Sequence, residues 1–416
     1  MRAIVTVLPL FALGIFAAEI PKAPIPPSPY LPIIYKFADA MLERGRDTNG
    51  LFYGALDRVA LAPLTNRPAA PANPQNHQNF LRVLYTLSEL SGKPKYRDAA
   101  DAELRWFVAN ANSQRHVSDR PWMLWDRCFE LAPEASRRFA DPAKHGFEMD
   151  FPRYAGFSIR TWAVAYAHMT NALLLDEIGG AAGRFATRRD PATGVLRLGP
   201  DISHPLVLSG LSLAIDCDAA GRLVPEPHAS KLRTLAAEQD HMFCSIAHGL
   251  KGGGGFVTGD PLATGADGTT TLWNPRTARN RGYTTAQVGM MCVSRYENTG
   301  KVAYREFIHA AADNYLNSMP GQDVDVWPMT FGHAISLQVA AWRSTAQQIY
   351  LDRARAFADF AVKHFFDQGP LPRASLKSTH YEAITGADTL ALGLVELHLH
   401  ILAITAVRCP ANTIDR

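Results

Sequence analysis

The sequence predicts an all-α fold, an α/α toroid of about six or seven inner and outer helix pairs, with long loops at one end. Two observations predict this class: a helix-pair pattern recurs along the 416 residues, and strand-like segments are few. The segments between the expected helices are long and rich in Gly and Pro. Such loops on a regular scaffold are usually functional, so we expect a cleft at their end of the ring.

The helix-pair pattern is clearest at residues 78–90, QNFLRVLYTLSEL, where apolar residues recur at helical spacing. A short turn then leads into a second expected helix over residues 96–109. Further copies are expected at 284–296 with 304–316 and near 334 with 350–366. Residues 157–178 are expected to form a first helix with a degenerate second half, and residues 383–402 a final first helix.

The second helices share a register, because Tyr96, Tyr304 and Tyr350 stand at equivalent places near their starts. The distance from Tyr304 to Tyr350 is one repeat, 350 − 304 = 46 residues, the length of two helices with their loops. A helix pair cannot bury its apolar faces alone, so the pairs must stack. Open stacking would give a solenoid, whereas the long loops favour a closed ring.

The chain is expected to divide into four segments. Residues 1–18 carry Arg2 followed by an apolar run, which predicts a secretory signal peptide, with an uncleaved anchor as the alternative. A Pro-rich leader over 19–30 precedes a single toroid domain over 31–408, and a tail covers 409–416. No later apolar run is long enough to span a membrane. We therefore expect a secreted or periplasmic protein that does not contact the membrane after cleavage.

Composition excludes several partners. The formal net charge of +3 shows no basic stripe, so no nucleic-acid partner is expected. The five cysteines are scattered without a C-x-x-C spacing, which argues against a zinc site or a disulfide framework but allows one bridge. No metal and no cofactor are predicted, and the sequence gives no indication of oligomeric state.

The densest polar cluster is the segment 273–283, WNPRTARNRGY, directly before an expected inner helix with Thr284 or Thr285 at its N-cap. Arginines pair with carboxylates and a tryptophan stacks on a pyranose ring, so the cluster suits an acidic sugar. The alternative is a solvated basic loop. The candidate residues are Trp273, Arg276, Arg279, Asn280, Arg281 and Tyr283.

A second cluster contains Glu238, His241 and His248. The two histidines are seven residues apart and would share one face of a helix. A metal pair is an alternative, but the H-E-x-x-H pattern is absent. We expect one histidine to face the cleft and the other to be structural, without deciding which.

Three more polar clusters precede expected inner helices, and Trp125 is a candidate for the cleft wall or the core. Helix capping is the alternative for the polar residues. Clusters at equivalent places in successive repeats converge in a toroid, which predicts a single central site. The candidates are Asn76 and His77, Arg153 and Tyr154 after Asp150, and His380 and Tyr381 before Glu382.

The repeat plan and several segments resemble the α/α-toroid polysaccharide lyases. The segments SGKPKYRDAADAELRWF, RPWMLW with FELAP, DFPRYAGF, the arginine-rich loop ending at Tyr283, and HYEAITGADTLALGLVELH are similar to polysaccharide lyase family 38. That family contains alginate- and glucuronan-cleaving enzymes, so the resemblance implies an anionic polysaccharide as substrate.

The resemblance implies β-elimination at a uronic acid. The enzyme must neutralise the carboxylate, remove the C5 proton and protonate the departing O4 oxygen. Tyr283 is the candidate base and acid, with Arg279 and Arg281 close in sequence. His241 is the candidate for a second group that transfers a proton or neutralises charge. Arg276, Asn280 and Glu238 are candidates for the carboxylate pocket. No divalent metal is required for this arrangement.

Two other functions remain open. A glycoside hydrolase on the same scaffold needs carboxylic acids in its cleft, for which Asp150, Glu238 and Asp388 are candidates. A non-catalytic helical-repeat protein that binds carbohydrate needs only a polar groove.

Overall fold

The computed structural model describes most of the chain in separate stretches. These are residues 28–64, 77–111, 211, 214–215, 218, 226, 228–257, 269–273, 276–277, 280–281, 283–321, 323–407 and 409.

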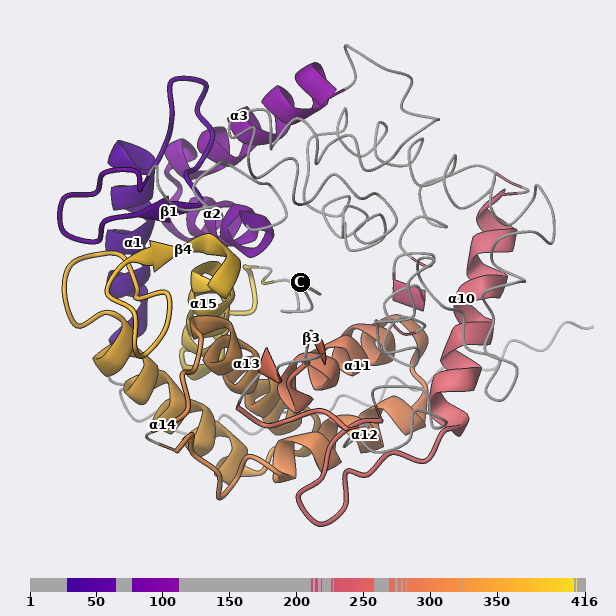
Figure 1. Cartoon of the computed structure of the whole chain (residues 1–416). Helices are drawn as coiled ribbons and strands as arrows, with labels where there is room; N and C mark the ends of the chain where they lie inside the picture. Colours follow the sequence, from indigo (N-terminus) through magenta and orange to yellow (C-terminus); the bar gives the residue numbers. More distant parts are fainter. Residues whose placement is uncertain are drawn as a thin grey trace, which may run out of the picture.

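The helices form a ring of two layers (Figure 1). The inner layer contains α2 (Gln78–Ser91), α11 (Thr285–Thr299), α13 (Pro328–Thr345) and α15 (Ala387–Ile401). The outer layer contains α1 (Tyr30–Arg44), α3 (Pro94–Ala111), α10 (His228–Ser245), α12 (Val302–Asp313) and α14 (Gln348–Phe365). This arrangement confirms the predicted all-α toroid.

Three pairs, α2 with α3, α11 with α12 and α13 with α14, share the same turn at the end of the inner helix. The residue after α2, α11 and α13 is Gly92, Gly300 and Ala346, and each has a left-handed backbone with φ of 68°, 67° and 57°. The amide of that residue donates to a carbonyl four residues earlier, which closes the helix. A two-residue turn then leads into the outer helix, as the sequence pattern predicts.

The outer helices are tied together by tyrosine–aspartate hydrogen bonds. Four outer helices carry a tyrosine in their first turn that donates to an aspartate on the neighbouring outer helix, and three of these tyrosines are the ones that share a register in the sequence. The bonds are Tyr96 to Asp39 (2.9 Å), Tyr304 to Asp240 (2.6 Å), Tyr350 to Asp313 (2.6 Å) and Tyr30 to Asp359 (2.8 Å). Burial, aided by the aspartate partner, raises the pKa of all four tyrosines above the usual range.

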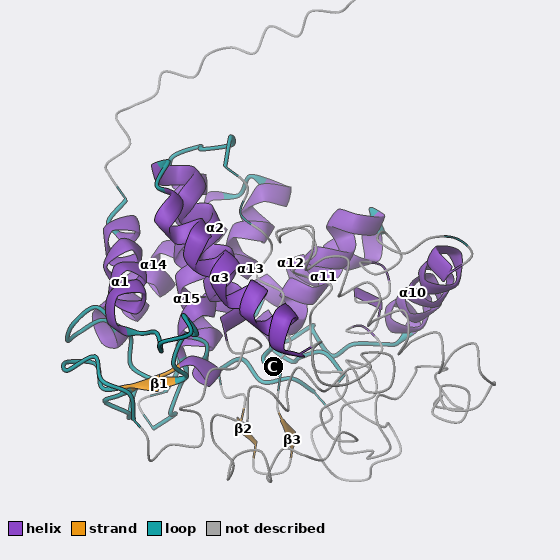
Figure 2. Ribbon diagram, turned by 90° about the horizontal axis from the view of Figure 1, so that it is seen from above, coloured by secondary structure: helices purple, strands orange, loops and turns teal. Residues whose placement is uncertain are grey.

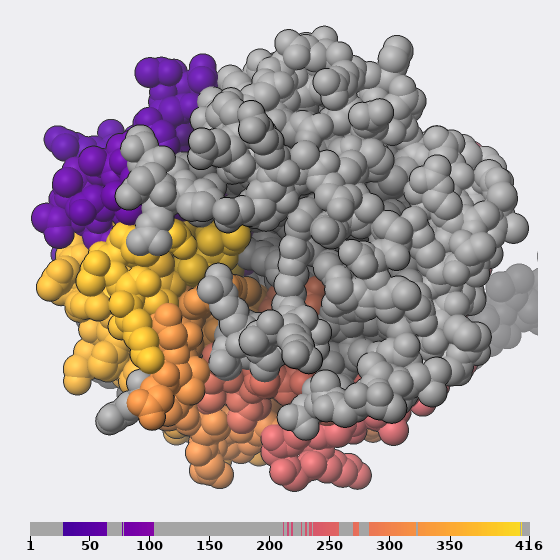
Figure 3. All heavy atoms as spheres, in the orientation of Figure 1, coloured from indigo at the N-terminus to yellow at the C-terminus, as the bar shows by residue number. Residues whose placement is uncertain are grey.

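The two ends of the described chain meet. The strand β1 (Ala55–Leu56) pairs antiparallel with β4 (Tyr381–Glu382), and Arg58 donates to the carbonyl of Leu371 at 2.7 Å. The space-filling view shows the indigo N-terminal surface beside the yellow C-terminal surface (Figure 3). A second short hairpin joins β2 (Arg276–Thr277) to β3 (Asn280–Arg281). A 3-10 turn, η3 (Ala383–Thr385), connects β4 to α15.

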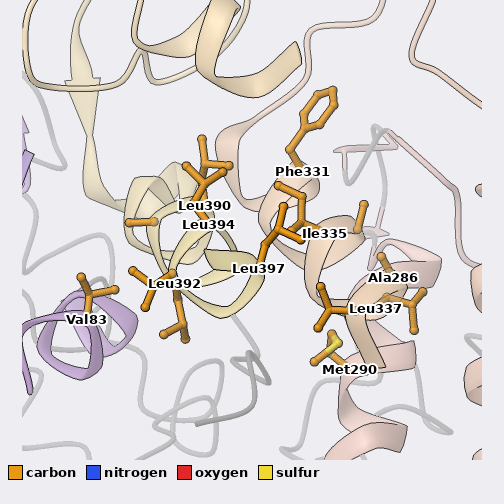
Figure 4. Close-up of a cluster of buried hydrophobic side chains, with 14 of the residues drawn as sticks. Val83, Ala286, Met290, Phe331, Ile335, Leu337, Leu390, Leu392, Leu394 and Leu397 are labelled. Atoms are coloured by element: carbon orange, nitrogen blue, oxygen red, sulfur yellow. The ribbon is translucent and has the colours of Figure 1, made fainter. Parts of the chain in front are cut away.

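The core lies between the inner helices and between the two layers. Leu394 and Leu397 of α15 lie beside Ile335 of α13, and Leu337 of α13 lies beside Met290 of α11 (Figure 4). Helices α13 and α15 approach most closely where two glycines face each other. A β-carbon on Gly332 would lie 2.4 Å from the Thr389 carbonyl oxygen, and one on Gly393 would lie 2.7 Å from the Gly332 carbonyl oxygen.

The expected helix at 157–178 lies outside the described residues, as do the proposed signal peptide and leader up to residue 27. Among the helices that the structure describes, none combines the length and the apolar character needed to cross a bilayer.

Candidate functional site at one face of the ring

The inner helices α2, α13 and α15 begin at the same face of the ring. The side chain of Asn79 in α2 donates to the hydroxyl of Thr389 in α15 at 3.0 Å. At the other side of α15, a β-carbon on Gly386 would lie 2.3 Å from the Met329 β-carbon, at the start of α13. The hairpin β2–β3, which leads into α11, lies on the same side of the helices as β1 (Figure 2). The polar segments that precede these helices therefore share one face.

Tyr283 stands directly before α11 on a well-anchored piece of backbone. The hydroxyl of Thr284 accepts from the amide of Gln287 at 3.2 Å, which confirms Thr284 as the N-cap. The amide of Thr285 donates to the Thr271 carbonyl at 2.8 Å. Tyr283 itself is half-buried and packs against the hydrophobic core. Its position is thus held from both sides while part of the ring stays accessible.

The hairpin β2–β3 carries three of the predicted polar residues. Its register pairs Arg276 with Arg281 and Thr277 with Asn280. The backbone of Arg281 is two residues from Tyr283, so two arginine positions and the tyrosine come together in the order that the sequence suggested. Arg279 lies outside the described residues.

His380 and Tyr381 have different environments although they are neighbours. His380 Nε2 lies 2.9 Å from Glu382 Oε1, and both side chains are largely but not fully buried. Tyr381 is completely buried, with its ring 6.1 Å from that of Phe37. The alternation follows from the strand β4, whose successive side chains point to opposite faces. Tyr381 is therefore a core residue, which corrects its prediction as a substrate contact.

His77 is buried at the start of α2 beside a carboxylate on α3. Its Nδ1 lies 3.7 Å from Glu103 Oε1, and both side chains are fully buried. The other carboxylate oxygen of Glu103 accepts from the Phe52 amide at 3.3 Å. The pair supplies two ligand types that metals bind, but the described residues contain no group of three His, Cys, Asp or Glu side chains placed to hold an ion. The neighbouring Asn76 lies outside the described residues.

Glu103 is a buried carboxylate beside the candidate His77, and the sequence analysis did not single it out. The signal was present, because Tyr96, Ala99, Ala100 and Glu103 recur at helical spacing, so the carboxylate lies on the buried face of α3. A charged residue on an apolar helix face requires a partner inside the protein.

The cluster around His241 does not lie where the sequence suggested. Asp240 on the inner face of α10 is buried and receives two hydrogen bonds from Arg295, at 2.8 and 2.7 Å. His241 is exposed beside it on the same helix, and Glu238 is partly buried. The five predicted polar clusters therefore do not all occupy equivalent places in the repeats. This one lies within α10, an outer helix, and does not precede an inner helix.

His248 is a structural residue. Its ring lies 4.6 Å from that of Phe243, 5.3 Å from Phe256 and 5.0 Å from Phe307. Its Nε2 lies 3.1 Å from the Phe243 carbonyl oxygen, and its Nδ1 accepts from the amide of Val257 at 3.3 Å. Burial lowers the pKa of His248 to about 4, so the imidazole is neutral and fully used by the backbone. Its prediction as a substrate contact is thereby corrected.

Trp273 is also a core residue. Its ring packs against Tyr315, Phe331 and Phe357 at centroid distances of 5.2, 5.1 and 5.2 Å. Its indole N–H donates to the Ser318 hydroxyl at 2.7 Å. With the ring buried and the donor engaged, this residue does not serve as a sugar platform.

Asp388, a candidate acid for hydrolysis, anchors two helix starts. One carboxylate oxygen accepts from the Phe80 amide at 3.1 Å and the other from the Thr389 amide at 2.7 Å. The side chain is 1% exposed, so it acts inside the protein. The remaining predicted residues, Trp125, Asp150, Arg153 and Tyr154, lie outside the described part of the chain.

Comparison with known families gives one match. A family described as periplasmic pectate lyase matches residues 49–118, the segment that includes α2, His77 and Glu103. The match covers less than half of the chain. A search of curated protein sequences finds no match to this chain.

Solved structures share the fold across almost the whole chain. The cellobiose 2-epimerase from Bacillus thermoamylovorans B4167 is 10% identical and has a TM-score of 0.55, covering 90% of this chain and 100% of its own. An unsaturated glucuronyl hydrolase specific for heparin is 11% identical with a TM-score of 0.53, covering 89% and 96%. The α-1,6-mannanase of Salegentibacter sp. HEL1_6 is 12% identical with a TM-score of 0.51, covering 89% and 99%. At such identities the likeness establishes the toroid alone.

Proposed function

We propose that this protein is a polysaccharide lyase that cleaves a uronic-acid polysaccharide by β-elimination, with Tyr283 as base and acid. The observation that carries the proposal is the place of Tyr283. It is half-buried, follows a hairpin that pairs Arg276 with Arg281, and stands at the ring face where inner helices begin. The match of residues 49–118 to a pectate lyase family supports the same reaction.

The proposed step removes the C5 proton of the uronate, forms the C4–C5 double bond and breaks the C4–O4 bond. The proton is delivered to the departing O4 oxygen, so atoms and charges balance. A tyrosine can take and return the proton when nearby positive charge favours its phenolate. The arginine positions of the hairpin supply that charge and neutralise the carboxylate. The positive end of the α11 dipole adds to the same field.

The substrate that we propose is a chain of uronic acids. The resemblance of the sequence suggests alginate or glucuronan, and the family match adds pectate. Two arginine positions on one hairpin favour an anionic chain over a neutral one. The periplasmic description of the matched family also supports export of the protein. Mass measurement of the mature N-terminus from a periplasmic or culture fraction tests this point, and a retained Met1 would contradict it.

Three of the predicted site residues take no part in this proposal. His248, Trp273 and Tyr381 are engaged in packing and backbone hydrogen bonds. His241 is exposed on the outer layer, so we assign the proton transfers to Tyr283 alone. His380, paired with Glu382 at the same face, remains a candidate for binding the substrate.

The test is absorbance near 235 nm, which rises only when elimination creates an unsaturated uronate. Purified protein is incubated with alginate, glucuronan, polygalacturonate and glycosaminoglycans. We expect a rise with one of them, and a loss of about 100-fold or more in Tyr283→Phe. Tyr35→Phe, a change at a partly buried tyrosine of α1, is the matched control and should keep the wild-type rate. New reducing ends without absorbance would indicate hydrolysis and overturn the proposal, as would full activity in Tyr283→Phe.

A further inference from the structure

A polar pocket lies between α11, α12 and α13, away from the proposed catalytic face. It has a volume of about 260 Å³ and is lined by Val293, Tyr296, Glu297, Arg305, Ile308, Ala340, Arg343 and Ser344. These residues come from the last turns of α11 and α13 and the first turns of α12. Tyr296 is 13 residues beyond Tyr283 along the chain, which corresponds to about 20 Å of helix.

The pocket has an apolar floor and a polar rim. Val293, Ile308 and Ala340 form the floor and are each less than a tenth exposed. The rim carries two arginines, Arg305 and Arg343, against one carboxylate, Glu297, so it holds one excess positive charge. A pyranose ring offers the same division, with apolar C–H groups on its faces and polar groups at its edge.

The polar side chains of the rim differ in their partners and in their exposure. Arg343 lies 3.3 Å from Glu297 Oε1, with both side chains nearly half exposed. The hydroxyl of Ser344 is 2.5 Å from His309 Nε2. Arg305 is exposed on the first turn of α12. A fork of N–H donors in this position suits a carboxylate, which it can bind with two hydrogen bonds.

We propose that this pocket binds a uronate unit of an acidic oligosaccharide as a second, non-catalytic site. The substrate class rests on the proposed function, whereas the pocket itself rests only on its geometry and charge. The Arg305 guanidinium holds the carboxylate, the Tyr296 ring lies along the sugar, and the Glu297–Arg343 pair accepts and donates to its hydroxyls. A site on the opposite face would hold a long substrate chain while another part of it occupies the catalytic face.

The experiment is calorimetric titration of a galacturonate trisaccharide into the full-length Tyr283→Phe protein at low salt, so that the ligand is not consumed. We expect two molecules bound per chain, and one in the Tyr283→Phe/Arg305→Glu protein. Arg305→Ala should weaken the second site about tenfold, the effect of losing one charged contact. Arg97→Glu is the matched control, because Arg97 is an exposed arginine of α3 beside Asp98, and it should leave both sites unchanged.

The outcomes separate the two proposals. If the catalytic proposal alone fails, one trisaccharide binds and Arg305→Glu abolishes it. If the pocket proposal fails, Arg305→Glu leaves the number and affinity of the bound molecules as in its parent. Binding of the neutral maltotriose at the Arg305-dependent site with equal affinity would also overturn the proposal, because the charge of the rim would then not favour an acidic sugar. The single variant Arg305→Glu, with Tyr283 intact, should cleave a short substrate at the wild-type rate.

Discussion

The Tyr30 hydroxyl donates to Asp359 Oδ1 at 2.8 Å and ties the first described helix to α14, across 329 residues of sequence. The same bond joins neighbouring outer helices at three other places. In α1, α12 and α14 the aspartate follows the tyrosine by nine residues, as in Tyr30 and Asp39. Each of these helices therefore donates at its start to one neighbour and accepts near its end from the next.

A double-mutant cycle tests the hydrogen bond from Tyr30 to Asp359, which joins α1 to α14. Tyr30→Phe removes the donor and should lower the free energy of unfolding by about 1 kcal/mol. Asp359→Ala should cost more, because it leaves the buried hydroxyl without this acceptor. We expect a coupling of about 1 kcal/mol between the two, measured by denaturant unfolding. Asp352→Ala, on the same helix, is the control and should show no coupling with Tyr30→Phe; additive effects of the first pair would contradict the tie.

The contact between α13 and α15 predicts a strong effect of a single methyl group. In Gly332→Ala the new β-carbon would lie 2.4 Å from the Thr389 carbonyl oxygen, which is backbone and cannot move aside without shifting α15. We expect a loss of about 2 kcal/mol in the free energy of unfolding. Gly321→Ala adds the same group where the nearest atom is Val324 Cγ2 at 3.9 Å, and it should be neutral. Equal stabilities of the two variants would show that the helices are packed less closely.

The fold was predictable because its repeat is local. The tyrosine register, the short turns and the alternation of helices follow from spacing along the chain, and the structure confirms them at Tyr96, Tyr304 and Tyr350. The aspartate partners were not predicted. A hydrogen bond such as that from Tyr304 to Asp240 spans 64 residues, and no local pattern specifies which carboxylate is its acceptor.

The site was predictable only in part. Thr284 as N-cap and Tyr283 at the ring face follow from their place before a helix. Trp273 and His248 were misjudged because a ring with a polar atom suits a core as well as a cleft. Here Ser318 and the Phe243 and Val257 backbone satisfy those atoms, and such partners are visible only in three dimensions.

Glu396 predicts a characteristic dependence of stability on pH. It is fully enclosed in α15 beside Ser336 of α13, near Arg343 and Glu297, and burial raises its pKa from 4.5 to about 7. A carboxyl that binds its proton more tightly in the folded state stabilises the fold at low pH. This contribution is complete below about pH 4.5 and is lost as the pH rises through about 7.

The matched variant for this prediction is Glu396→Gln, which keeps the shape but does not titrate. Between pH 4.5 and 8, the free energy of unfolding of the wild-type protein should fall by on the order of 3 kcal/mol relative to that of the variant. The measurement is denaturant unfolding of both proteins at several pH values. Parallel stability curves would show that Glu396 is ionised in the folded protein throughout this range.

The last prediction concerns the arginine hairpin before Tyr283. The β2–β3 register pairs Arg276 with Arg281, two residues before the tyrosine that we propose as base. If these positions neutralise the uronate carboxylate, their charge matters most in the transition state, where the negative charge spreads from C5. Arg281→Ala should then reduce kcat/KM on the responsive polysaccharide by about 100-fold, while the free energy of unfolding stays within about 0.5 kcal/mol of wild type.

Arg281→Lys should recover part of the rate, since it restores the charge without the fork of donors. Arg97→Ala removes an exposed arginine from the outer layer and should change neither quantity. A wild-type rate in Arg281→Ala would make the hairpin a solvated basic loop, and Tyr283 would then need another source of positive charge.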